Sequence, residues 1–143
     1  MRTIGNILWL LLGGLPMAIG YTFAGLLMFV FVITIPFGVQ AFKLAGFALW
    51  PFGRVMVDIP RRSAGLSTIG NILWLVFGGL WLAIGHLVSA LLLAVTIIGI
   101  PFALAQVKMA GAALTPFGRT VVSREGANAR YGAVVISVEP LRR

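Results

Sequence analysis

A tandem repeat constrains this chain more than any other feature of its sequence. Residues 3–57 and 68–122 align at a constant offset of 65 residues without a gap, and 31 of the 55 aligned positions are identical. Each copy opens with the letters TIGNILWL and reaches PFGR near its end. The chain therefore has to build one local structure twice, and each special residue can be compared with its counterpart.

Both copies are almost entirely apolar. Two tracts, Ile4–Trp50 and Ile69–Leu114, each contain one Lys and no Arg, Asp or Glu. Only 10% of the chain is charged, whereas about a quarter of a soluble domain is. A helix needs about 20 residues to cross a hydrocarbon core about 30 Å thick, so each tract is long enough to cross twice. The sequence predicts an all-α membrane protein whose first partner is the lipid bilayer.

The positive charge lies outside the two tracts. The net charge is +8, and Lys and Arg accumulate on the cytoplasmic side of membrane proteins. The arginines that report topology are Arg54, Arg61, Arg62 and Arg119. Because basic residues precede, separate and follow the tracts, we expect an even number of crossings per copy, cytoplasmic termini and parallel repeats related by an axis along the membrane normal. This charge pattern favours topology and lipid contact over nucleic-acid binding.

Two subdivisions of a tract satisfy that topology. In the first, a helix over residues 4–21 turns near Thr22–Gly25, and a second helix kinked at Pro36 returns, which gives four transmembrane helices in two hairpins. In the second, one long helix ends near Thr34 and a short interfacial or re-entrant segment covers residues 35–50. The sequence favours four transmembrane helices over two long ones with re-entrant segments.

The chain divides into two membrane repeats and two polar segments. The expected boundaries are membrane repeat 1 at 1–58, a cytoplasmic linker at 59–67, membrane repeat 2 at 68–123, and a basic cytoplasmic tail at 124–143. Short β-branched runs occur at 54–60, 119–122 and 133–139. They either pair as a small cytoplasmic sheet or leave a disordered tail.

Small residues recur at matched positions of the first helix in each copy. They are Gly13, Gly14, Ala18, Gly78, Gly79 and Ala83. Helices in lipid associate mainly by close packing, which small residues permit. We therefore expect these positions to mediate helix packing.

Few polar residues lie inside the tracts, and two pairs of them are matched. Lys43 and Lys108 either snorkel to the headgroups or line a pore for anions. Asn6 and Asn71 either cap a helix or form hydrogen bonds between the repeats.

Other polar residues are not repeated. His86 has Tyr21 as its counterpart, and Gln40 and Gln106 occupy different positions in the two copies. Comparison of the copies therefore assigns no shared role to His86 or to either glutamine, and a single histidine of this kind is typical of a membrane interface.

Reactive groups are scarce. The chain has no cysteine, and its three acidic residues, Asp58, Glu125 and Glu139, lie outside the tracts. The sequence therefore offers no catalytic set, metal-ligand cluster or phosphate-binding loop. We expect a protein that is not an enzyme and that carries no cofactor.

The duplicated TIGNILW and PFGR motifs make the chain resemble the YccF-type inner-membrane component domain family. The resemblance covers about residues 3–122 and implies a multi-pass protein of the bacterial inner membrane, without implying an activity. We expect a structural or accessory membrane protein that works through helix packing, as a homo-oligomer or beside a larger membrane partner. The alternative is a channel or facilitator with a pore between repeats or subunits.

Overall fold

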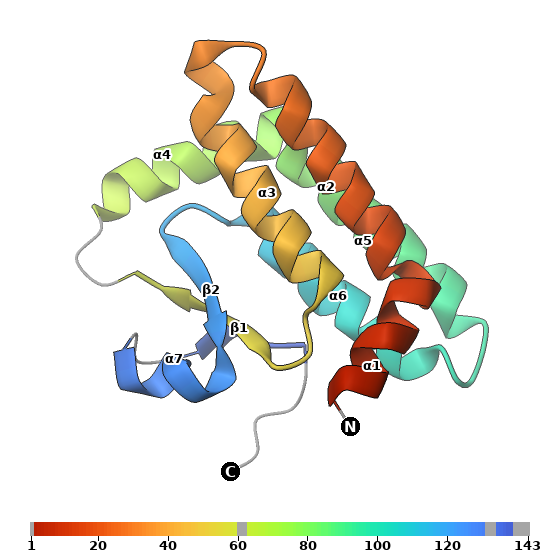
Figure 1. The fold of residues 1–143 in the computed structure, drawn as a ribbon. Coiled ribbons are helices and arrows are strands. Elements are labelled where there is room, and N and C mark those ends of the chain that lie inside the picture. Colours follow the sequence, from red (N-terminus) through yellow and green to blue (C-terminus); the bar gives the residue numbers. More distant parts are fainter. Residues whose placement is uncertain (1, 60–62, 131–133, 139–143) are drawn as a thin grey trace.

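The computed structural model describes residues 2–59, 63–130 and 134–138, and it contains two similar helical units and a small sheet (Figure 1). The first unit comprises α1 (Arg2–Trp9), η1 (Leu10–Gly14), α2 (Leu15–Met28), η2 (Val32–Thr34), α3 (Ile35–Leu49) and β1 (Arg54–Asp58). The second comprises α4 (Ala64–Trp74), η3 (Leu75–Gly79), α5 (Leu80–Ala94), α6 (Ile100–Leu114) and β2 (Arg119–Ser123). The tail adds α7 (Arg124–Arg130) and β3 (Val134–Ile136). The expected helical repeats and the small sheet are confirmed.

A kink interrupts the first helix of each unit at the same place. The kinked segments are η1 and η3, and both end in the paired glycines that the sequence repeats. In η1 the helix breaks at Gly13, whose backbone is not helical (φ 161°, ψ −15°), and η3 is a π-helical turn, which inserts one extra residue and commonly bends a helix. As a result α1 and α4 point away from the helices that follow them, α2 and α5 (Figure 1).

Each unit then forms a helical hairpin, but its turn lies later than the sequence indicated. The turn expected at Thr22–Gly25 was wrong, because α2 continues through it and Thr22 Oγ1 donates to the Ala18 carbonyl inside the helix. Pro36 lies at the start of α3, where its missing N–H is not needed, instead of kinking a helix interior. The break is closer to that of the second subdivision, but the long first helix ends at Met28, before Thr34, and the stretch Val32–Leu49 that follows is itself long enough to cross a membrane.

In the described part of the chain, three helical stretches are long and apolar enough to cross a membrane by length and composition. They are Arg2–Met28, Val32–Leu49 and Ala64–Ala94, and Ile100–Leu114 is a shorter apolar helix. Large apolar side chains cover the outer faces of these helices, as in Ile19 at 60% exposure and Leu91 at 70%.

The three strands form an antiparallel sheet in the order β2-β1-β3. Each unit enters it through a tight turn that needs a left-handed residue, Gly53 (φ 95°) or Gly118 (φ 81°). One face of the sheet packs on the helices through Met56, and the other packs on Ala127 of α7 through Val55 and Val57.

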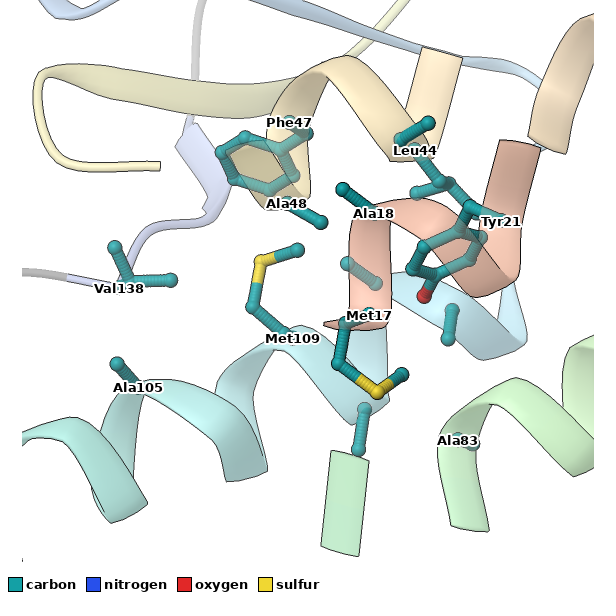
Figure 2. Close-up of a cluster of buried hydrophobic side chains, with 14 of the residues drawn as sticks. Met17, Ala18, Tyr21, Leu44, Phe47, Ala48, Ala83, Ala105, Met109 and Val138 are labelled. Atoms are coloured by element: carbon teal, nitrogen blue, oxygen red, sulfur yellow. The ribbon is translucent and has the colours of Figure 1, made fainter. Parts of the chain in front are cut away.

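The tail also reaches the helical core. Figure 2 shows Val138 beside Ala105 and Met109 of α6, with Phe47 and Ala48 of α3 nearby, and these residues belong to one buried cluster. The sheet therefore lies between a layer of apolar helices and α7.

The expected linker is partly helical. Helix α4 begins at Ala64, and the Ser63 hydroxyl accepts a hydrogen bond from the Leu66 N–H at 3.5 Å. Arg61 and Arg62, which we expected to report topology, lie outside the described residues.

Candidate functional site

The two units are related by a pseudo-two-fold axis that passes through two contacts between equivalent residues. In the sheet, Met56 pairs with Val121, and in the helices the Tyr21 hydroxyl lies 3.0 Å from His86 Nε2. Both pairs are separated by the repeat offset of 65 residues. Residues on such an axis meet their own counterparts, so identical side chains there would offer each other identical groups.

The helical end of this axis carries a buried polar chain of three side chains, the axial chain Tyr21, His86 and Gln106. His86 Nδ1 lies 2.5 Å from Gln106 Oε1, and a carbonyl oxygen only accepts, so Nδ1 carries the proton. In the neutral imidazole Nε2 then accepts from the Tyr21 hydroxyl. All three residues are fully buried. Figure 2 shows Tyr21 projecting from α2 toward the other hairpin.

One atom of the axial chain lacks a partner. Among the described residues, Gln106 Nε2 is a fully buried side-chain nitrogen that makes no hydrogen bond. It faces Gly13, where an added Cβ would lie 2.7 Å from it. The absence of a side chain at Gly13 therefore makes the room that the amide occupies.

A second set of polar contacts is repeated in both units and secures the end of each hairpin. The Asn6 side chain donates to the Phe52 carbonyl at 2.9 Å and accepts from the Phe52 N–H at 3.0 Å. Asn71 makes the same pair of bonds with Phe117, at 3.2 and 2.8 Å. Each asparagine acts within its own repeat, where its amide matches a backbone N–H and carbonyl, rather than capping a helix or joining the repeats.

The first tryptophan of each repeat anchors the same region. Trp9 Nε1 donates to the Ala48 carbonyl and Trp74 Nε1 to the Ala113 carbonyl, both at 2.6 Å. Both indoles are fully buried. A bulky ring fits there because the chain has glycine at position 14 or 79, where an added methyl group would overlap the indole.

The six small residues expected to mediate packing are all buried within the chain. Gly14 and Gly79 face the tryptophan of their own unit, whereas Gly78 faces Met28 of the other hairpin. Ala18 and Ala83 are 3% and 4% exposed. Their close approaches therefore lie inside one molecule.

The two matched lysines differ in environment. Lys43 Nζ donates to the Pro116 carbonyl at 2.5 Å and to the Arg119 carbonyl at 2.8 Å, and it also bonds Gln40. It therefore binds the backbone of the other repeat instead of snorkelling. Lys108 is exposed on α6.

The two edges of the sheet near these lysines also differ. The backbone bonds Ile59 N to Gly118 O and Arg124 N to Gly53 O set the register, which turns the Arg119 backbone toward the free edge of β2. Lys43 caps that edge, whereas β3 pairs with the equivalent edge of β1 at Met56.

Charged groups gather at the sheet end of the molecule. Arg119 pairs with Asp58 across the strands at 3.1 Å, and Arg54 donates to the Gly46 carbonyl. Arg2 pairs with Glu125 of α7 at 2.5 Å, and this hydrogen bond lowers the pKa of the Glu125 carboxyl below its usual range. The start of the first repeat is thereby joined to the segment that follows the second.

Sequence comparison of the copies missed the axial chain. His86 and Gln106 were given no role because neither is repeated. His86 nevertheless contacts its own counterpart, Tyr21, and the two side chains can bond because they differ. The repeat alignment carried a signal for this contact. Tyr21 and His86 are both polar and occupy one aligned position, and two such residues can form a hydrogen bond where they meet on the axis between the repeats.

The fold and these contacts define a small integral membrane protein made of two copies of one helical hairpin unit. The YccF family, described as an inner membrane component domain, matches residues 4–54 and again residues 69–119. The chain belongs to this family.

Two curated relatives agree with this assignment. The chain is 36% identical over 137 residues to inner membrane protein YccF of Escherichia coli (strain K12), covering 90% of this chain and 93% of that protein. The figures for inner membrane protein YccF of Shigella flexneri are the same. No solved structure matches the chain.

Proposed function

We propose that this protein is a non-enzymatic structural component of the bacterial inner membrane, which holds its sheet and α7 against the cytoplasmic side. The observation that carries the proposal is the use of its polar groups. Asn6, Asn71, Lys43 and the axial chain all bind other parts of the same chain. Polar side chains in an apolar phase are costly, and here they stabilise one architecture.

The charge distribution supports cytoplasmic termini. Arg2, Arg54 and Arg119 lie around the sheet end, and Arg2 bonds Glu125 beyond the second repeat. Basic residues favour the cytoplasmic side, and this bond keeps the N-terminal segment and α7 together.

A pore between the repeats has less support than the structural role. Tyr21, His86 and Gln106 meet there and are fully buried, so packed side chains occupy the path that a solute would need. A matched pair of pore-lining lysines also has little support, because Lys43 binds backbone carbonyls of the other repeat.

The structural role predicts different results at the two matched lysines. Lys43→Met removes a charged donor from two carbonyls and should lower the free energy of unfolding by about 1–3 kcal/mol. Lys108→Met, the matched control, should leave it unchanged because Lys108 is exposed. Thermal unfolding of both variants in mild detergent measures this difference.

Solute flux provides the contrary outcome. Liposomes that contain the purified wild-type protein should release ions no faster than empty liposomes. Conductance that either lysine substitution reduces would overturn the structural role in favour of a channel.

The proposal includes self-association. Because the repeated small residues are packed inside the chain, a contact between copies has to use part of the exposed apolar faces of the hairpins, and lipid covers the rest. Light scattering in mild detergent should give a protein mass of two or more times 15.3 kDa. A monomer at all protein concentrations would contradict this part of the proposal.

A further inference from the structure

The direction of the pseudo-two-fold axis relative to the helices restricts how the molecule can sit in a membrane. Helices α2 and α5 run antiparallel along their length. A Cβ added at Gly78, in η3 just before α5, would lie 3.0 Å from Met28 Cε at the end of α2. A Cβ added at Gly13, in η1 just before α2, would lie 3.9 Å from Leu93 Cδ1 at the end of α5. Since equivalent residues meet near the middle, at Tyr21 and His86, the axis runs across both helices.

The sheet lies at one end of the same axis, because β1 and β2 pair about Met56 and Val121. The strands and α7 carry Arg119, Asp58 and Glu125, which form ion pairs there and need water or headgroups around them. If α2 and α5 crossed the bilayer, the axis would lie in the membrane plane and the sheet would sit at mid-depth. Charged groups at that depth are expensive, so the axis is better placed along the membrane normal.

Aromatic contacts lead to the same arrangement. Phe37, just after the first hairpin turn, lies 5.3 Å from Phe117, two residues before Arg119. Phe102, just after the second turn, lies 6.3 Å from Phe52 beside Arg54. Each hairpin turn is therefore followed at once by contact with the arginine-bearing turn of the other unit. If a hairpin spanned the membrane, its turn and the arginine-bearing turns would lie on opposite sides of a hydrocarbon core about 30 Å thick.

The hairpin turns themselves suit an apolar phase. Their exposed side chains are Val30, Phe31, Val32 and Ile33 in the first, and Val95, Ile97 and Ile98 in the second. Trp and Tyr, which are typical of an outer membrane interface, are absent from both stretches.

Threonine hydroxyls satisfy backbone groups in both turns. Thr34 Oγ1 donates to the Met28 carbonyl at 2.5 Å, and Thr96 Oγ1 donates to the Leu93 carbonyl and accepts from the Gly99 N–H. Backbone groups in lipid need such internal partners, whereas a turn in water does not.

We propose that the protein is monotopic, with all four hairpin helices lying along the membrane in the cytoplasmic leaflet and its acyl chains covering their outer faces and both turns. The kinks at η1 and η3 divide the stretches Arg2–Met28 and Ala64–Ala94. Each straight helix of a hairpin then has only 14 or 15 residues and is about 22 Å long, which is less than the hydrocarbon core of about 30 Å. This arrangement differs from the multi-pass arrangement that the sequence favours. It does not depend on the structural role proposed above, since it concerns depth and orientation alone.

Single cysteines at equivalent turn positions test the proposal, because the chain has no cysteine of its own. The side chains of Ile33 and Ile98 are 83% and 78% exposed, so the substitutions Ile33→Cys and Ile98→Cys should disturb folding little. A membrane-impermeant maleimide added outside spheroplasts should label neither variant. Gly126→Cys in α7 should be labelled only in inside-out vesicles, and each turn variant should be labelled after solubilisation in SDS.

The alternatives give different patterns. Labelling of both turns from outside would overturn the proposal in favour of parallel spanning hairpins. Labelling of one turn from each side would overturn it in favour of helices that cross in opposite directions. Spin labels at the two turns should report equal depth and high accessibility to oxygen.

Polarised infrared spectroscopy of the unmodified protein in oriented bilayers provides a test without any variant. The amide I dichroism should show the helix axes mainly in the membrane plane. Helix axes mainly along the membrane normal would overturn the proposal, whatever the function of the protein.

Discussion

His86 and Tyr21 illustrate how a single residue depends on its position relative to the axis. Equivalent residues that meet there need different chemistry to form a donor and acceptor pair, and this chain has a phenol in one copy and an imidazole in the other. Gln106 then fixes the second imidazole nitrogen. The counterpart of Gln106 is Ala41, so the polar chain extends to one side only.

Substitutions in the axial chain should be strongly non-additive. His86→Phe leaves the Tyr21 hydroxyl and Gln106 Oε1 buried without partners and should reduce the free energy of unfolding by about 2 kcal/mol. The triple variant that adds Tyr21→Phe and Gln106→Leu should regain much of this loss, because all the unpaired groups are then removed.

Unfolding in detergent micelles measures both variants. Val88→Phe, at a half-exposed position of the same helix, is the control and should be close to neutral. A triple variant as unstable as the sum of its three single substitutions would contradict the hydrogen-bonded chain.

At the scale of elements, the helix kinks and the tryptophans form one structural unit in each repeat. The non-helical backbone at Gly13 in η1 bends the first helix, and Gly14 leaves the space into which the Trp9 indole folds to reach the end of α3. The same arrangement recurs at η3 with Gly79 and Trp74. A helix kink and a hairpin anchor therefore come from one local motif.

Glycine substitutions should separate this structural unit from ordinary helix glycines. Gly14→Ala and Gly79→Ala force a methyl group against the indole and a carbonyl oxygen 3.1 Å away, and each should cost about 1–3 kcal/mol. Gly46→Ala and Gly111→Ala are matched controls in α3 and α6 with no atom within 4 Å of the added Cβ. They should stabilise by about 0.5–1 kcal/mol.

Thermal unfolding of the four variants checks this difference in sign. Equal effects at all four positions would mean that the glycines next to the tryptophans act only through helix propensity.

At the scale of the whole molecule, a charged contact joins α7 to the start of the chain. The Arg2 to Glu125 pair is exposed, and its pKa effect has a definite sign. The folded-state pKa of Glu125 is lowered, so its stabilising contribution is present above the unfolded pKa and is lost as pH falls through the folded pKa.

Acidification should therefore loosen α7 before the helices unfold. The protection factors of the α7 amides, measured relative to the intrinsic exchange rate at each pH, should be high in the wild type at neutral pH and should fall when Glu125 becomes protonated. Glu125→Gln should exchange faster at neutral pH and lack that acid-dependent step, and raised salt should reduce the difference. Identical pH profiles for the two proteins would contradict a role for this pair.

Many large features follow from the sequence alone. The duplication, the apolar tracts, the basic flanks and the β-branched runs predicted two helical membrane units and a small sheet. These are properties of residues and their near neighbours, so periodicity and composition report them. The turn position was wrong because Gly25 does not end the helix: it lies inside α2, where its missing side chain makes room for the Phe42 ring.

Only the tertiary structure decided how the two units face each other. Tyr21 and His86 meet, Lys43 binds the other repeat while Lys108 does not, and α2 runs opposite to α5. Hydropathy has the same value whichever way a helix points, so it measures affinity for lipid without fixing orientation. Orientation comes from contacts between residues about 65 positions apart, which exist only after the two copies have docked.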